Sequence, residues 1–277
     1  MTSIDYEAEY NNRARVPEHP AIIEGWARDA SEYRRSAAGR FESLRYGPSD
    51  RQAIDLFRPA ATDSAEAAMV LFIHGGYWQS FDCSYFSHLA RGLNAHGIAV
   101  ALPGYDLCPL VGVGDIVDQI RSACRLLGRR TRRLIVTGHS AGGHLAACML
   151  ATDWRAIDPA LPDDFVPAAY AISGLFDLKP LLGTYVNKAL QLNDAEAERL
   201  SPLFWTPPAG RVLDAVVGGS ESTEYRRQSR SIVEHWGAAG VTTRYEEIEE
   251  ANHFTAIAPL ADPKSAMTQR IASLARI

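Results

Sequence analysis

The sequence contains few cysteines, and none of them occurs in a metal-binding or redox pattern. The 277-residue chain has four, Cys83, Cys108, Cys124 and Cys148. Because no C-x-x-C pair is present, the spacing favours neither a zinc site nor a disulfide framework. We therefore expect reduced, mostly buried thiols in a cytoplasmic protein, with no metal site.

Long apolar runs and charge of one sign are also missing. The first sixteen residues carry charges throughout and have no apolar segment typical of a signal peptide. The longest uncharged run, 134–152, is interrupted by glycines, a serine and histidines and is therefore a poor membrane span. The net charge is −5 and no stripe of Lys or Arg occurs. Neither a membrane nor a nucleic-acid partner is expected.

The chain does contain eight short apolar runs rich in β-formers, separated by segments with helical periodicity. This alternation predicts an α/β fold with a mostly parallel sheet, helices on both faces and an antiparallel pair at one edge. No repeat or linker divides the chain, so one domain over 1–277 is expected, with the proline-rich stretch 174–210 as a cap-like insertion. The expected strands are 41–46, 53–59, 69–73, 98–102, 133–138, 168–173, 213–218 and 243–248. The expected helices lie within 84–97, 115–128, 224–240 and 262–277.

A G-x-S-x-G pattern follows the strand expected at 133–138. Gly138-His139-Ser140-Ala141-Gly142 lies between an apolar strand and a helix. A nucleophilic serine above a sheet needs a sharp turn in which side chains two residues before and after it would collide, so glycines fit there. The competing interpretation is an ordinary glycine-rich turn with a serine helix cap. The strand–turn–helix context favours a nucleophile at Ser140.

A serine nucleophile needs a general base and an acid, which follow it in this topology. His139 and His144 are too close to the turn, and His235 has the setting of a surface histidine near a helix end. His253 follows the last expected strand in a polar loop and is the predicted base. Glu221 lies just beyond the preceding strand and is the predicted acid.

Two other acidic residues near that strand are less suited to orienting the base. Glu224 has the position of a helix first-turn residue, where its charge suits the helix dipole. Asp214 comes too early in its strand to reach the edge of the sheet. Glu221 therefore remains the predicted acid.

The sequence His74-Gly75-Gly76-Tyr77-Trp78 ends an earlier strand. Gly75 and Gly76 can expose backbone N–H groups, which together with that of Ala141 would form an oxyanion hole. His74 is expected to brace this loop. Tyr77 and Trp78 could form an aromatic wall for a planar substrate, or they could be packing aromatics of a loop.

Taken together, several segments resemble the kynurenine formamidase (arylformamidase) family of α/β-hydrolases, which is close to the hormone-sensitive-lipase-like esterases. The resemblance covers roughly residues 5–275. It rests on "HGGYW", "GYDLCP", "GHSAGGHLA", "SGLFDLKPL" with Asn187, "LSPL", "GSESTEYRRQS" and "NHF".

The resemblance implies an α/β-hydrolase fold, with the family's nucleophile at Ser140 and its base at His253. Its acid, usually aspartate, falls on Glu221. It further implies cofactor-free hydrolysis of N-formylkynurenine to formate and kynurenine. It also suggests pocket residues at Tyr105, Phe176, Tyr185 and Asn187.

Three functions stay open on the sequence. The leading hypothesis is a serine hydrolase of small aromatic formamides that acts on a small-molecule substrate through an acyl-enzyme. A carboxylesterase would use the same residues on small acyl esters, and a non-catalytic binding protein could keep the fold. Dimers occur among related hydrolases, so a homodimer is a further hypothesis.

Overall fold

An eight-stranded sheet forms the centre of the protein in a computed structural model that describes residues 4–60 and 69–276. The strand order is β1-β2-β4-β3-β5-β6-β7-β8, antiparallel at the β1-β2 and β2-β4 pairs and parallel elsewhere. The eight expected strands and the antiparallel edge are thus confirmed. The strands are β1 (Phe41–Arg45), β2 (Ala53–Phe57), β3 (Met69–Ile73), β4 (Ala99–Pro103), β5 (Leu134–His139), β6 (Ala168–Ile172), β7 (Val212–Gly218) and β8 (Thr242–Ile248).

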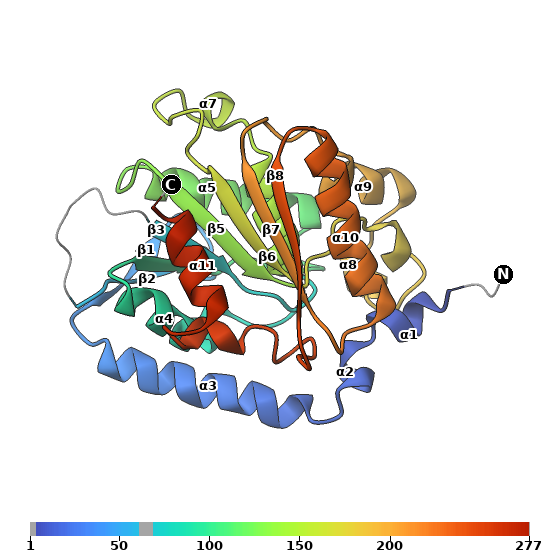
Figure 1. Cartoon of the computed structure of the whole chain (residues 1–277), viewed down its shortest axis with the longest axis horizontal. Helices are drawn as coiled ribbons and strands as arrows, with labels where there is room; N and C mark the ends of the chain where they lie inside the picture. The colour runs from blue at the N-terminus through green and yellow to red at the C-terminus, as the bar shows by residue number, and fades with distance from the viewer. Residues whose placement is uncertain (1–3, 61–68, 277) are drawn as a thin grey trace.

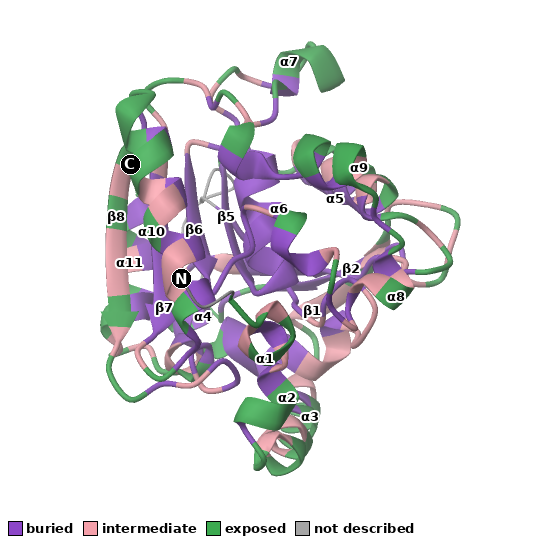
Figure 2. Cartoon of the chain, turned by 90° about the vertical axis from the view of Figure 1, so that its right-hand side faces the viewer, coloured by how far each residue is buried: buried purple, intermediate pink, exposed green. Residues whose placement is uncertain are grey.

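Helices cover both faces of this sheet, which explains why its central strands are apolar throughout. In β3, Leu71 and Ile73 pack into the core on one face, and Val70 and Phe72 into the core on the other. Figure 2 shows the resulting buried centre, with α6 enclosed in it. One face is covered by α3 (His19–Ser36), α4 (Ala90–Ala95) and α11 (Ala266–Leu274), the other by α5 (Val113–Leu127), α6 (Ala141–Leu150) and α10 (Thr223–Ala238).

The helices that the periodicity predicted are present, with one difference. The segment expected as a helix over 84–97 begins as the 3-10 helix η1 (Cys83–Leu89) and continues as α4. Gly97 follows α4 with a φ of 77°, as a glycine at a helix end commonly does. All four cysteines are buried and free. Within the described ranges, no helix is long and apolar enough to cross a membrane.

Short helical elements occupy the connections. Residues 174–210 join β6 to β7 without a strand, and their role as a cap-like insertion in a single domain stays a prediction. The short elements are α7 (Trp154–Ile157), η2 (Lys179–Leu181), α8 (Asn187–Leu190), α9 (Asp194–Arg199), η3 (Pro202–Phe204) and η4 (Ala258–Ala261).

Three helices precede the sheet, and sequence reasoning did not predict them. They are α1 (Tyr6–Tyr10), α2 (Asn12–Arg15) and α3. Figure 1 shows α1 beside the start of α10 and α3 running below α4 and α11. Trp26, Ala30 and Tyr33 are the buried residues of α3. Their spacing of four and three residues is the periodic signal that could have revealed this helix.

Candidate active site

Ser140 lies at the turn between β5 and α6 in a conformation that a non-glycine residue rarely adopts. Its φ is 57° and its ψ is −118°. A Cβ atom on Gly138 would lie 2.1 Å from the carbonyl oxygen of Gly142, and one on Gly142 would lie 2.0 Å from that of Ile73. The turn can therefore form only with glycine at both positions. These short distances are the collisions that the sequence predicts for side chains two residues before and two residues after Ser140.

Glu221 and His253 follow β7 and β8 and are paired at the same edge of the sheet. His253 Nδ1 lies 2.6 Å from Glu221 Oε2. Glu221 Oε1 accepts hydrogen bonds from the Ser173 hydroxyl at 2.5 Å and the Gly218 N–H at 2.7 Å. Both oxygens of this buried carboxylate are thus held in place. Because Nδ1 of His253 faces the carboxylate, Nε2 is the ring nitrogen that remains available for proton transfer.

The alternative acids and base lie elsewhere. Glu224 forms a two-point ion pair with Arg227 in the first turn of α10. Asp214 lies within β7 and pairs with Arg270. His235 lies in the last turn of α10.

Three backbone N–H groups surround Ser140 without a hydrogen-bond acceptor among the described residues. They belong to Gly75, Gly76 and Ala141. Gly76 has a φ of 108°, which glycine tolerates best. A Cβ atom on Gly75 would lie 3.0 Å from that of Ser140. The loop after β3 therefore approaches the serine as closely as backbone allows, and its donors remain free for an oxyanion.

His74 supports this loop from beneath. Its Nδ1 donates to the Gly75 carbonyl at 2.8 Å, since a carbonyl can only accept. Its ring stacks between those of Phe86 and Tyr105, and the Tyr105 hydroxyl donates to the His74 carbonyl at 2.9 Å. Burial lowers the pKa of His74 to about 4, so the ring is neutral at pH 7. His74 and Tyr105 support the loop and do not line the pocket described next.

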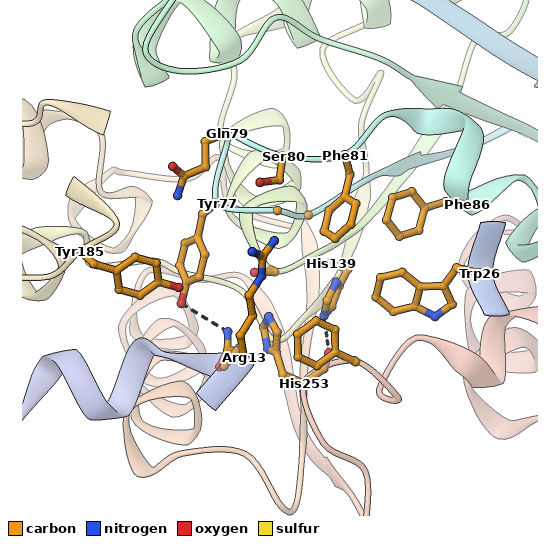
Figure 3. Close-up of a pocket in the computed structure, with 15 residues that line it drawn as sticks. Arg13, Trp26, Tyr77, Gln79, Ser80, Phe81, Phe86, His139, Tyr185 and His253 are labelled. Atoms are coloured by element: carbon orange, nitrogen blue, oxygen red, sulfur yellow. Dashed lines mark hydrogen bonds between the residues drawn. The ribbon is translucent and has the colours of Figure 1, made fainter. Parts of the chain in front are cut away.

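A pocket of about 180 Å³ opens above Ser140 (Figure 3). Of the predicted aromatic residues, Tyr77 and Tyr185 line it. Trp78 does not, because its fully buried ring packs edge-on against His144. The pocket is lined by Asn12, Arg13, Trp26, Gly75, Gly76, Tyr77, Gln79, Ser80, Phe81, Phe86, His139, Ser140, Tyr185, His253 and Phe254.

Phe176 and Asn187, the other residues suggested by the resemblance, are also absent from that lining. Phe176 is fully buried, and its backbone N–H donates to the Gln228 side chain. The Asn187 side chain bonds to the backbone of Leu182 and Leu192, so it shapes its own loop.

His139, set aside as a base, has a supporting position behind His253. Its Nε2 donates to the His253 carbonyl at 2.8 Å. Burial, and secondly the neighbouring imidazole of His253, hold the pKa of His139 well below its usual range. A neutral His139 thus fixes the backbone that carries the predicted base.

Tyr225 of α10 was not predicted as a site residue, although it contacts two residues that were. Its ring centroid lies 4.5 Å from that of His253, and its hydroxyl lies 2.7 Å from that of Tyr77. Because the Tyr77 proton is donated to the Tyr10 carbonyl, Tyr225 is the donor in that pair. The Asn12 amide donates to the Tyr225 hydroxyl at 2.9 Å. The N-terminal segment is therefore tied directly to the residues beside Ser140.

Comparisons with known proteins agree with this architecture. Residues 70–269 match the model of the alpha/beta hydrolase family. A kynurenine formamidase of Danio rerio is 30% identical over 250 residues, covering 87% of this chain and 84% of the relative. A Silicibacter protein described provisionally as a thioesterase is 34% identical, with a TM-score of 0.83 over 97% of this chain and 99% of its own.

More distant structures share the fold alone. An esterase of Pyrobaculum calidifontis is 19% identical and has a TM-score of 0.71 over 93% of this chain and 92% of its own. The family match covers the loops that carry Ser140, Glu221 and His253. The chain therefore belongs to the alpha/beta hydrolase family, as a hydrolase related to the kynurenine formamidases.

Proposed function

We propose that this chain is a cofactor-free serine hydrolase of small aromatic N-formyl amides of the N-formylkynurenine type. The observation that carries the proposal is the convergence of three features on one pocket. These are the strained serine, the histidine paired with a buried carboxylate, and a loop with unpaired backbone donors. Acyl transfer to serine requires each of them.

In the first half of the reaction, Ser140 Oγ attacks the formyl carbon and its proton passes to Nε2 of His253. Glu221 holds the tautomer and stabilises the imidazolium. The N–H groups of Gly75, Gly76 and Ala141 bind the oxyanion. His253 then donates its proton to the amide nitrogen, the C–N bond breaks, and the aryl amine leaves a formyl ester on Ser140.

In the second half, water attacks this ester. His253 accepts a proton from the water as the new C–O bond forms, and the same donors bind the second oxyanion. The bond from carbon to Ser140 Oγ breaks as His253 returns the proton to the serine, and formic acid leaves and releases its remaining proton to give formate. No redox step or further reactant is required.

The pocket supports an aromatic substrate with a small acyl group. Tyr77, Tyr185, Phe81 and Phe254 supply flat surfaces along its walls. A cavity of about 150 Å³ is enough for benzene, so the volume of about 180 Å³ suits a single ring. That the relatives are named kynurenine formamidases supports a formamide as the substrate of this chain.

A carboxylesterase or thioesterase is the second candidate, supported by the provisional thioesterase description of the Silicibacter relative. The same residues would act on either bond, since the pocket decides which leaving group fits. Rates on N-formylkynurenine and p-nitrophenyl acetate separate the two. Rapid ester cleavage with no turnover of the formamide would overturn the formamidase proposal.

A serine-directed fluorophosphonate tests the mechanism itself. We expect covalent labelling of the wild type and none of Ser140→Ala, with a fall in turnover of at least about a thousandfold. An unlabelled but folded wild type would favour the non-catalytic binding protein instead. Circular dichroism of both proteins provides the control for folding.

A further inference from the structure

Arg13 is the one permanently charged side chain among the described residues that line the pocket. The other lining residues are aromatic, small, or neutral polar apart from the two histidines, and no Asp or Glu is among them. Figure 3 shows the Arg13 guanidinium reaching into the pocket between Tyr77 and His139. A ligand in this pocket therefore meets a fixed positive charge with no negative charge beside it.

The Arg13 guanidinium has no hydrogen-bond or ion-pair partner within residues 4–60 and 69–276 that would account for its position. Among the described residues, no carboxylate lies within salt-bridge distance of Arg13, whereas its neighbour Arg15 lies 4.0 Å from Glu9. Arginine keeps its charge at all relevant pH values and presents a planar fork that matches a carboxylate. Arg13 thus gives the pocket a group that can bind an anion.

The backbone that carries Arg13 is held firmly in place. The preceding residue, Asn12, is buried and donates to Tyr225. The Asn11 side chain caps α2 by accepting from the Ala14 N–H, and Val16 is buried beyond it. Because α2 is fixed on both sides of Arg13, binding an anion should order the Arg13 side chain without having to order its backbone.

We propose that Arg13 binds a carboxylate on the leaving-group side of the substrate, so that the preferred substrates are anionic or zwitterionic aryl formamides. This inference rests on the proposed function. A formyl group is too small to carry a second charged group, so the carboxylate must belong to the aryl amine. The oxyanion loop then fixes the formyl end and Arg13 fixes the opposite end of the substrate.

The test compares two substrates that differ in this carboxylate, N-formylkynurenine and its decarboxylated analogue N-formylkynuramine. For Arg13→Gln we expect the ratio of kcat/KM between them to fall about tenfold or more, chiefly through KM of the carboxylate substrate. Arg13→Lys should recover part of the ratio, since the charge remains but the fork is lost. Arg15→Gln is the matched control and should leave the ratio within about twofold of wild type.

Salt gives a second readout. Raising the ionic strength should raise KM for N-formylkynurenine in the wild type and much less in Arg13→Gln, because screening weakens an exposed ion pair. Equal losses on both substrates, or an unchanged ratio, would overturn the inference. Thermal unfolding of each variant checks that the fold is kept.

Failure of the proposed function would look different. If the wild type cleaves esters but neither formamide, the formamide substrate class is wrong. The same ratio is then measured with 4-acetoxybenzoate and phenyl acetate, and an unchanged ratio in Arg13→Gln overturns the role of Arg13. If the wild type cleaves none of these substrates, the hydrolase proposal fails and the inference fails with it.

Discussion

The pocket has two walls that are held in place in different ways. The loops at the carboxyl edge of the sheet are positioned by backbone geometry, through strand ends, glycines and the strained turn at Ser140. The N-terminal helices α1 and α2 are positioned by side chains. Tyr10 donates to Glu224, 214 residues further along the chain, and Asn12 donates to Tyr225.

This difference separates two kinds of task. Few substitutions are compatible with a glycine turn or with a loop that presents backbone donors. The edge of the sheet therefore suits the steps of acyl transfer that are the same for every substrate. A segment held by side chains can change its residues without disturbing the strands. Under the proposed function, the N-terminal segment is therefore where substrate choice is set, and Arg13 is the residue that sets it.

The largest effect that tests this division is expected at the edge of the sheet. Glu221→Gln removes the charge that stabilises the His253 imidazolium and disturbs its tautomer, so kcat should fall about a thousandfold or more. Glu224→Gln is the matched control and should cost less than about tenfold in kcat. Its main effect should be on stability, through the contacts with Arg227 and Tyr10. A larger loss of activity from Glu224→Gln would identify it as the acid.

The two adjacent aromatics should differ in what they affect. Trp78→Ala removes a fully buried ring and should lower the free energy of unfolding by about 3–5 kcal/mol. Tyr77→Phe loses the hydroxyl contacts to Tyr10 and Tyr225 and should change KM instead. Urea unfolding and steady-state kinetics measure the two effects.

Trp78→Phe serves as the milder variant if Trp78→Ala does not fold. It should destabilise the protein while its KM for N-formylkynurenine remains near that of wild type. A change in substrate preference in Trp78→Phe would indicate that Trp78 contacts the substrate as part of an aromatic wall.

A smaller effect is expected where the N-terminal segment meets Tyr225. Asn12→Ala removes the donor to the Tyr225 hydroxyl and should lower kcat/KM by about tenfold. Asn11→Ala, which removes the cap of α2 but no site contact, is the control. Equal kinetic losses in both variants would mean that general loosening of α2, and not this contact, affects the site.

The smallest effect concerns the scaffold of the sheet edge and its response to pH. Burial lowers the pKa of His74 and His144 to about 4 in the folded protein. The unfolded chain therefore binds more protons below about pH 6.5, and stability falls as the pH is lowered from there toward 4. Between pH 7 and 6 we expect a loss of about 0.7 kcal/mol for each histidine.

Urea unfolding at pH 7 and pH 6 measures this loss. His144→Gln should make the loss of unfolding free energy between pH 7 and pH 6 smaller by about 0.7 kcal/mol. His235→Gln, a change at an exposed residue, is the control and should leave the loss near the wild-type value. A steeper loss in His144→Gln would contradict the assignment of a neutral, buried His144.

Much of the fold was predictable because its signals are local. Each strand is an apolar run of the right length, and α5 carries apolar residues at helical spacing. The helices α1 and α2 were not predictable in the same way. They have four or five residues each, too few for a periodic pattern, and their stability comes from contacts with α10.

The site residues also differ in whether a local sequence signal identifies them. Ser140 stands out in the sequence because its turn needs glycines at fixed offsets, and Glu221 and His253 follow because they end consecutive strands. Arg13 and Asn12 have no motif around them, and only tertiary structure brings them to the pocket. Trp78 looked equivalent to Tyr77 in sequence, yet Tyr77 lines the pocket while Trp78 is fully buried against His144.

The long separation between the N-terminal helices and α10 has a consequence for synthesis on the ribosome. Tyr10 and Asn12 leave the ribosome early, but their partners Glu224 and Tyr225 are made more than 200 residues later. Until then, α1 and α2 lack the contacts that fix them to α10, although Tyr77 can already bond to Tyr10 and Asn12. Closure of the pocket is therefore among the last events of folding, and the nascent chain should gain hydrolytic activity only after α10 and the later loop that carries His253 have both emerged.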